Sequence, residues 1–353
     1  MTTTRLWLFV ASTVLLAGCS DLAYYAQATK GQLEIVAKRE PIRDLIDDPD
    51  IEDSLRSRLI LVNRIRDFAS SHLGLPDNRS YRYYTDLERS HVVWNVVATG
   101  KFSLEPITWC FPVAGCVAYK GYFSKAKSEM LNETLVDQGY DTFFYGVTAY
   151  STLGWFADPV LNTFIHYDEL SLAGLIFHEL AHQVVYIQDD SAFNEAFATA
   201  VEVEGIRHWL EANQSEGAFQ SYLDLQARHQ AITAMVLSYR DQLATVYSES
   251  LMETDEQRSA LSERKRAIFS AMGAQYLTMS QTGQGTRYYD WWFDLPLNNA
   301  HLISVATYHE WVPAFTKLIE RADDFPSFFQ SVKRLGDMDP AQRQAELRVL
   351  LDE

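Results

Sequence analysis

Five residues near the middle of the chain, HELAH at positions 178–182, restrict the fold more than any other part of the sequence. In an α-helix, residues i and i+4 lie on one face, with Cβ atoms about 5–6 Å apart. His178 and His182 can therefore bind one cation, at Zn–N distances of about 2.0–2.1 Å. Glu179 lies about 100° further round the helix, where it can act on a water molecule without binding the metal. The pattern predicts a helix with two zinc ligands and a general base.

A catalytic zinc site needs a third protein ligand and one open position. The first helix is expected to end near residues 186–188, because residues 189–191 have the composition of a turn. A second helix is predicted over residues 192–210. If the two helices pack antiparallel, His182 and Glu195 lie about one turn from the connection, on either side of it. Glu195 is therefore the predicted third ligand.

The segment FNEAFATAVE, residues 193–202, resembles the stretch that carries the third zinc ligand in gluzincin metallopeptidases of the aminopeptidase N type. Thermolysin-type enzymes have a related Asn-Glu-Ala. The resemblance implies that His178, His182 and Glu195 bind zinc and that Glu179 is the general base. Two features differ. The segment between His182 and Glu195 is shorter than in those families, and the Gly-x-Met-Glu-Asn motif that binds the substrate amine is absent, so amine recognition does not carry over.

Several further segments resemble a bacterial family of predicted zinc aminopeptidases, which are often predicted lipoproteins. The segments are TWCFPVAGCVAYKGYF, AYSTLGWFADPVLN, HELAHQ, FNEAFAT and LNNAHLISVATYHEWVPAF. Together they extend over most of the chain that follows the first 18 residues. The resemblance implies peptidase activity, with Zn²⁺ as the cofactor and a peptide as the substrate.

Groups around the ligands are expected to orient the imidazoles. Asn194 and Thr199 lie close to Glu195 in the sequence, and Glu202 offers a carboxylate to a histidine. Gluzincins also use a Tyr or His from further along the chain to stabilise the oxyanion. The resemblance favours Tyr308 for this role. The alternatives are other ring side chains of the same half: His301, His309, Tyr288 and Tyr289.

The N-terminus has the pattern of an export signal. Arg5 precedes an apolar run, residues 6–17, that is too short to span a bilayer and has the length of a signal-peptide core. The run ends in LAGC, which resembles the lipobox of bacterial lipoproteins and implies a lipid on Cys19. An ordinary secretory signal is the alternative. Because Ser20 follows instead of Asp, the expected location in a Gram-negative host is the outer membrane, facing the periplasm.

Cys110 and Cys116 are the cysteines that remain once Cys19 is set aside. They flank FPVAG, whose Pro and Gly suit a tight connection, and an oxidising compartment favours pairing. Two buried thiols are the alternative. Two cysteines alone make a poor zinc site, because closed structural sites use four ligands. We therefore expect a local disulfide.

The charge of the chain restricts its partners. A formal net charge of −17 argues against nucleic-acid binding, because phosphate contacts need a basic face. The apolar content of 47% indicates a folded core. The expected partners are a peptide substrate and, through Cys19, a membrane. No sequence feature fixes the oligomeric state.

The pattern of apolar residues predicts an α+β fold. Residues 32–73 have helical periodicity, and residues 81–123 have the composition of three or four short antiparallel strands. A helix over residues 124–138, another strand and the motif helix follow, and nearly everything beyond residue 213 is helical. The expected fold is zincin-like: a small antiparallel sheet, then the HExxH helix, then a mostly helical C-terminal lobe.

Three regions are expected along the chain. Residues 1–18 form the lipoprotein signal peptide, residues 19–212 hold the N-terminal helices, the sheet and the zinc-site helices, and residues 213–353 form the helical C-terminal lobe.

These observations predict an envelope-anchored zinc metallopeptidase, with an aminopeptidase as the first choice. A zinc endopeptidase of envelope proteins is the alternative within the enzyme class. A non-catalytic envelope lipoprotein that holds zinc for structure is the alternative from another class. Glu179 discriminates between the classes, because a structural zinc site has no use for a carboxylate between its histidines.

Overall fold

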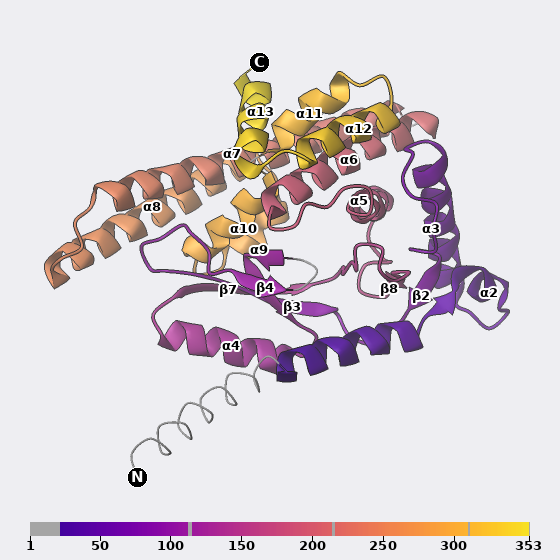
Figure 1. The fold of residues 1–353 in the computed structure, drawn as a ribbon, viewed down its shortest axis with the longest axis horizontal. Coiled ribbons are helices and arrows are strands. Elements are labelled where there is room, and N and C mark those ends of the chain that lie inside the picture. Colours follow the sequence, from indigo (N-terminus) through magenta and orange to yellow (C-terminus); the bar gives the residue numbers. More distant parts are fainter. Residues whose placement is uncertain (1–21, 112–114, 214–215, 310, 353) are drawn as a thin grey trace, which may run out of the picture.

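The computed structural model describes residues 22–111, 115–213, 216–309 and 311–352 (Figure 1). The strands are short: β1 (Glu40–Pro41), β2 (Tyr83–Thr85), β3 (Val93–Thr99), β4 (Trp109–Phe111), β5 (Gly115–Val117), β6 (Tyr119–Tyr122), β7 (Asp141–Val147) and β8 (Val160–Leu161). A first helix covers residues 22–37. The other helices of the first half are α2 (Ile42–Asp47), α3 (Asp53–Ser71), α4 (Lys125–Asp137), α5 (Glu169–Ala181) and α6 (Ser191–Ala212).

The second half is helical. Its elements are α7 (Glu216–Glu249), α8 (Asp255–Thr282), η1 (Arg287–Tyr289), α9 (Asp290–Phe293), α10 (Asn299–His309), α11 (Val312–Glu320), α12 (Phe325–Gly336) and α13 (Pro340–Asp352). The predicted α+β class with a mostly helical C-terminal region is confirmed. Among the described residues, no helix combines the length and the apolar character needed to cross a bilayer.

The N-terminal helical region is not continuous, as expected over residues 32–73, but broken between residues 38 and 52. Pro41 has no backbone N–H and pairs with Tyr83 in the short ladder between β1 and β2. A second break follows α2, at Asp48 and Pro49. The sequence pattern predicted helices here correctly but missed both proline breaks.

The strands form three sheets instead of one. The main sheet has the antiparallel order β6-β3-β7, and β4 and β5 form a separate hairpin. β2 pairs in parallel with β8, which lies far along the chain. The expected antiparallel pairing within residues 81–123 is confirmed for β3 with β6 and for β4 with β5. The parallel partner of β2 was not predicted, because local alternation does not identify a distant strand.

Helices cover both faces of the main sheet (Figure 1). On one face, α4 packs through Leu135 against Val96 and Ala98 of β3. On the other face, the ring of His301 from α10 lies 4.2 Å from the ring of Phe143 of β7. The sheet is therefore held between α4 and the C-terminal helices.

α5 and α6 pack closely because glycines lie at their contact. A Cβ atom on Gly205 would lie 2.7 Å from the ring of Phe177, and one on Gly174 would lie 2.9 Å from Ile206. Phe177 and Ile206 are both buried. The two helices can therefore approach this closely only because both positions are glycine, which has no Cβ atom.

The C-terminal helices share the core of α6. The rings of Phe193 and Phe315, from α6 and α11, lie 5.0 Å apart. From α13, Arg343 donates to the Asp190 carboxylate at 2.9 Å, and its side chain is almost fully buried. The predicted boundary after residue 212 therefore falls between helices that belong to one hydrophobic core.

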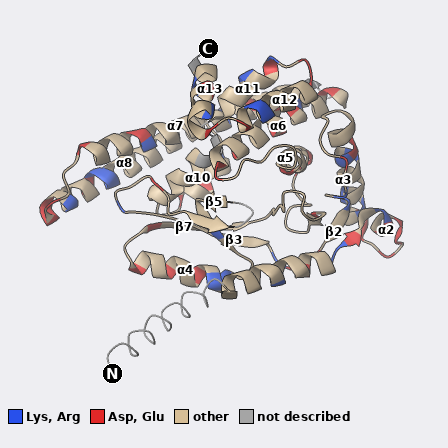
Figure 2. Cartoon of the chain, viewed as in Figure 1, with Lys and Arg blue, Asp and Glu red and all other residues tan. Residues whose placement is uncertain are grey.

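α7 and α8 form a long hairpin that extends to one side of the molecule (Figure 1). Figure 2 shows residues of both charges along this hairpin. Its firmest polar contact with the sheet is Lys265 of α8, which donates to Asp141 of β7 and to the carbonyl of Lys101. The buried face of the hairpin also packs in one core cluster with Val97 of β3 and Phe143 of β7, and the rest of its surface faces solvent.

Candidate metal centre

The motif helix α5 ends at Ala181, about one and a half to two turns earlier than the expected end at residues 186–188. The amides of Gln183 and Val184 bond to carbonyls three residues back, at 3.1 and 2.8 Å, which tightens the chain into a turn. His182 is the C-cap, but its φ of −58° and ψ of −22° are still helical. Its i+4 relation to His178 is therefore preserved.

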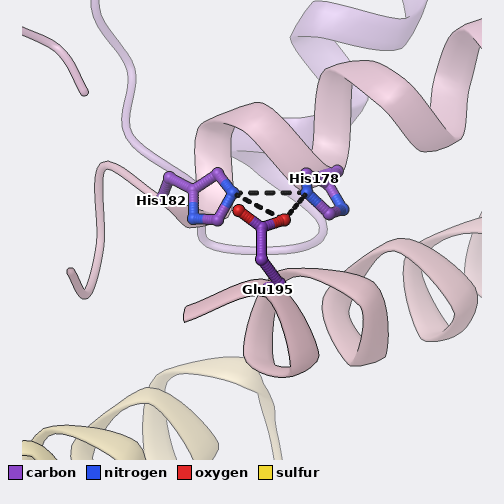
Figure 3. A group of neighbouring side chains, drawn as sticks. All are labelled: His178, His182 and Glu195. Carbon is purple, nitrogen blue, oxygen red and sulfur yellow. Dashed lines mark hydrogen bonds and ion pairs between the residues drawn. The ribbon is translucent and has the colours of Figure 1, made fainter. Parts of the chain in front are cut away.

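The three predicted ligands converge (Figure 3). The Nε2 atoms of His178 and His182 lie 3.2 Å apart. Oε2 of Glu195 lies 3.3 Å from Nε2 of His178 and 3.8 Å from Nε2 of His182. A tetrahedral zinc site with bonds of about 2.0–2.1 Å has ligand atoms about 3.3 Å apart. The donor atoms thus have the spacing that one zinc ion requires.

The electrostatics also favour a cation. Burial lowers the pKa of His182 to about 4, so its imidazole is neutral, which is the form that binds metals. Burial opposes protonation of His178 too, but Glu195 and Glu202 raise the pKa of that imidazole well above its usual value. Burial also works against ionised Glu195, yet the two histidines lower its pKa. Two carboxylates therefore favour positive charge between the imidazoles.

Glu202 holds one of the two histidines in place. Its Oε2 lies 3.1 Å from Nδ1 of His178, the nitrogen that points away from the metal position. Such a contact fixes the orientation and tautomer of a metal-binding imidazole. In the described part of the chain, Thr199 makes no hydrogen bond to either histidine. Nδ1 of His182 is buried there without a hydrogen-bond partner.

Asn194 has a different task from the expected one of fixing an imidazole. Its side chain accepts from the amide of Ile187 and donates to the carbonyl of the same residue, both at 2.7 Å. It is almost fully buried. Asn194 therefore ties the connection after His182 to the first turn of α6, one residue before Glu195.

Two contacts of Asp190, at the start of α6, set the position of this helix. Asp190 is the N-cap and accepts from the amide of Phe193 at 3.1 Å. The same carboxylate accepts from Arg343. The ligand Glu195 thus lies on a helix whose first turn is fixed both by its own cap and by the distant α13.

Glu179 lines the same cleft as the three ligands but is not one of them. Burial raises the pKa of its carboxyl group to about 7, with Glu195 and Asp158 adding to this effect and a hydrogen bond with Ser151 opposing it. A general base works best when its pKa is close to the working pH. Glu179 thus lies in the same cleft as the candidate ligands and has a pKa near neutral, which makes it the candidate general base.

The cleft beside the ligands has a volume of about 530 Å³ and extends from α5 across the main sheet to the first helix. No Lys or Arg is among the described residues that line it. Many of its walls are aromatic: Tyr24, Phe111, Tyr119, Phe123, Tyr150 and Tyr186. It has the size and the mixed lining of a small-molecule or peptide site.

Residues 23–347 match the model of a protein family described as "Putative aminopeptidase". The chain belongs to this family. No curated protein and no solved structure matches it. Membership of the aminopeptidase family supports peptidase activity and agrees with a cleft that holds a group of side chains that could bind a metal ion.

The expected oxyanion donor of this aminopeptidase-family chain, Tyr308, lies in α10, but its side chain is outside the described residues, as is that of His309. The alternative His301 is buried against Phe143 and bonds to Asn298, away from the cleft lining. Tyr288 and Tyr289 lie beside His229, also outside that lining. None of these three alternatives lines the cleft.

Two tyrosines that the sequence analysis missed do line the cleft, Tyr119 and Tyr186. Burial, and then the charge of Glu195, raises the pKa of both hydroxyl groups, so each stays protonated and able to donate. Tyr186 lies four residues after His182, so the helical spacing expected for this segment could have pointed to it. Tyr119 comes from β6, and nothing in the sequence relates it to the motif.

The disulfide between Cys110 and Cys116 joins β4 to β5. The amide of Cys116 donates to the Asp189 carboxylate, at 2.5 Å, in the connection between α5 and α6. Phe111 of the same hairpin lines the cleft. The disulfide hairpin therefore links a cleft wall to the connection between the two ligand helices. Cys19 lies outside the described residues.

Proposed function

We propose that this protein is a zinc-dependent aminopeptidase. The observation that carries the proposal is the convergence of His178, His182 and Glu195 at the spacing of zinc ligands, with Glu179 beside them in one cleft. Membership of the aminopeptidase family supports the same reaction class. A purely structural zinc site would be closed by a fourth protein ligand and would not need Glu179.

The chain's own residues divide the work of peptide hydrolysis. His178, His182 and Glu195 would hold the zinc ion, which when bound supplies a Lewis acid for the carbonyl group and lowers the pKa of a water molecule. The Glu179 carboxylate accepts a proton from the attacking water and returns it to the nitrogen of the leaving amine. Glu202 keeps His178 in its binding orientation.

A tyrosine hydroxyl completes the set as the donor to the developing oxyanion. Tyr119 and Tyr186 are the candidates, because both line the cleft and the charge of Glu195 acts on both. Removal of one oxyanion donor costs about 10²–10³-fold in kcat. Tyr119→Phe and Tyr186→Phe, each measured for kcat and KM, identify the donor as the variant that loses kcat on this scale.

The charge of the cleft favours the amino end of a peptide. The described lining contains the carboxylates of Glu179 and Glu195 and no Lys or Arg. A free α-amino group is positively charged near neutral pH and can pair with a carboxylate, whereas a C-terminal carboxylate would find no Lys or Arg side chain in that lining to pair with. An endopeptidase is the second candidate. Acetylation of the substrate amine separates the two, since only an aminopeptidase loses its substrate.

The decisive experiment compares wild type with Glu179→Gln, using protein that lacks residues 1–19. Wild type should contain about one zinc ion and release amine from amino-acid arylamides or short peptides. Glu179→Gln should keep the zinc and lose about 10²–10⁴-fold in turnover. Glu133→Gln, an exposed position on α4, is the matched control. If wild type and Glu179→Gln hold zinc and are equally inert, the protein is a zinc-binding lipoprotein and not an enzyme.

Anchoring at the outer membrane is a further part of the proposal. The LAGC sequence ends at Cys19, and the first helix, which contributes Tyr24 to the cleft, is described from residue 22 onward. Three residues span at most about 10–11 Å, so a lipid on Cys19 would keep this helix close to the bilayer. Wild type grown with labelled palmitate should carry the label in the outer-membrane fraction, and Cys19→Ala should carry none. A labelled Cys19→Ala protein would contradict the anchor.

A further inference from the structure

Two neighbouring aromatic side chains at the cleft remain open to solvent. Trp155 is 72% exposed and Phe156 is 52% exposed, although both line the cleft that holds the metal ligands. Large apolar side chains are usually buried, and exposed ones beside a concave site commonly contact a ligand. Trp155 and Phe156 therefore offer apolar surface that the protein itself does not cover.

The loop that carries them is firmly built. Thr152 donates from its amide and its hydroxyl to the carboxylate of Asp158, at 2.9 and 2.8 Å, which closes the loop. The amide of Phe156 donates to the Thr152 hydroxyl at 3.1 Å, and that of Trp155 to the Thr152 carbonyl at 3.1 Å. Asp158 is 2% exposed. The two aromatic side chains are thus presented by a loop of fixed shape.

The loop also contains a left-handed residue that is not glycine. Leu153 has a φ of 55°, and Gly154 follows with a φ of 82°. A left-handed L-residue costs about 1–2 kcal/mol and persists where its surroundings require it, often at ligand-binding sites. The strained conformation agrees with a loop that is shaped for contact with a ligand.

The loop is connected to the metal end of the cleft. A Cβ atom on Gly154 would lie 3.4 Å from the side chain of Gln183, which directly follows the ligand His182. Gln183 is held in turn by Asn78, whose amide donates to it at 2.7 Å, and by the hydroxyl of Ser80 at 3.2 Å. The exposed aromatic side chains therefore have a fixed position relative to the ligands.

We propose that Trp155 and Phe156 form a subsite for a large apolar side chain of the peptide substrate. The inference rests on the proposed peptidase function and names a substrate class for it. The occupant is a substrate side chain because the two residues line the same cleft as Glu179 and the metal ligands. The loop from Ser151 to Pro159 carries no Lys or Arg that would pair with an anionic lipid surface.

The test uses two short peptides that differ at one residue, Phe in one and Ser in the other, both with a free amine. In Trp155→Ala/Phe156→Ala, kcat/KM for the Phe peptide should fall about tenfold or more, through KM, while the Ser peptide changes less than about threefold. Trp291→Ala, which removes a 56% exposed tryptophan away from the cleft lining, should change neither. Zinc content and circular dichroism should be unchanged in all three proteins.

Binding is measured separately from cleavage. Calorimetric titration of the Glu179→Gln protein with both peptides should show tighter binding of the Phe peptide, and the double substitution should remove that difference. The subsite proposal would be overturned if the double substitution lowered kcat/KM equally for the two peptides. It would also be overturned if the Glu179→Gln protein bound both peptides equally well. If the Phe peptide binds selectively but wild type cleaves neither peptide, the proposed function fails and the subsite stands.

Discussion

The pair α5/α6 and the pair α7/α8 are both built from consecutive helices, but they restrict their sequences differently. In α5/α6, small residues lie at the contact and Phe177 is fully buried. In α8, only a narrow set of residues is buried, and a Cβ atom on Gly273 would meet nothing within 4 Å. The comparison shows that α5 and α6 require small residues at their contact. The α7/α8 hairpin requires only a stripe of buried residues and a few polar contacts such as that of Lys265.

The largest expected effect comes from removing the support that α13 gives to α6. Arg343→Ala leaves the Asp190 carboxylate without its partner and should lower the free energy of unfolding by about 3 kcal/mol, because a broken ion pair with a buried member leaves a charge uncompensated. Urea unfolding measures this. Arg266→Ala, at an exposed position of α8, is the control and should cost less than about 0.5 kcal/mol. Equal losses would contradict the contrast between the pairs.

The second effect is on metal affinity. Glu202→Gln removes the negative charge from the partner of His178 and should weaken zinc binding about 10–100-fold. Competition with a chelator of known affinity measures the change. Glu263→Gln, an exposed position on α8, should leave zinc affinity as in wild type. An unchanged affinity in Glu202→Gln would mean that the second carboxylate does not support the ligand.

The third effect is a pH dependence of stability near the cleft. Burial raises the pKa of Asp158 to about 6, so the folded protein binds this proton more tightly than the unfolded chain. The contribution to stability is therefore full at low pH and is lost as the pH rises through about 6. Between pH 4 and pH 6 it should fall by about 2 kcal/mol.

Asp158→Asn should remove this slope. Urea unfolding at pH 4, 5 and 6 gives the free energy of unfolding of wild type and variant. The contributions of other titrating groups cancel in the difference between the two proteins. Glu263→Gln, whose side chain is exposed, should keep the slope of wild type. Parallel curves for wild type and Asp158→Asn would show that Asp158 is not the group responsible.

The smallest expected effect is the change in stability on replacing a glycine with alanine, which has opposite signs in the two helix pairs. Gly205→Ala places a methyl group 2.7 Å from the buried ring of Phe177 and should destabilise the protein by about 1 kcal/mol or more. Gly273→Ala meets no atom and should stabilise it by about 1 kcal/mol, because alanine has the higher helix propensity. Thermal unfolding of both variants measures the signs. The same sign in both would remove the distinction drawn between the pairs.

The features that were predicted correctly from the sequence are those that depend on local spacing. Helical periodicity places His178 and His182 on one face, and a turn followed by a second helix brings Glu195 to them. The α+β class also followed from the order of patterns. These features depend on residues within a few turns of each other, so a single chain is enough to see them.

What the sequence could not predict depends on contacts between distant segments. Tyr119 reaches the cleft through the pairing of β6 with β3, and Asn194 bonds to Ile187 instead of an imidazole. The parallel pairing of β2 with β8 has the same origin. Residue type and spacing do not specify such tertiary contacts. The early end of α5 at Ala181 is local, since amides in the turn that follows bond to carbonyls three residues back.

The contact between Arg343 and Asp190 also bears on when the protein can become active during its synthesis. The two residues are 153 positions apart, so the helix that bears Glu195 lacks its brace until that length of chain has left the ribosome. A nascent chain would therefore hold the candidate ligands before one of their helices is braced by α13. If hydrolysis needs that brace, a peptidase built in this order is inert toward neighbouring unfolded polypeptides until its own folding is nearly finished.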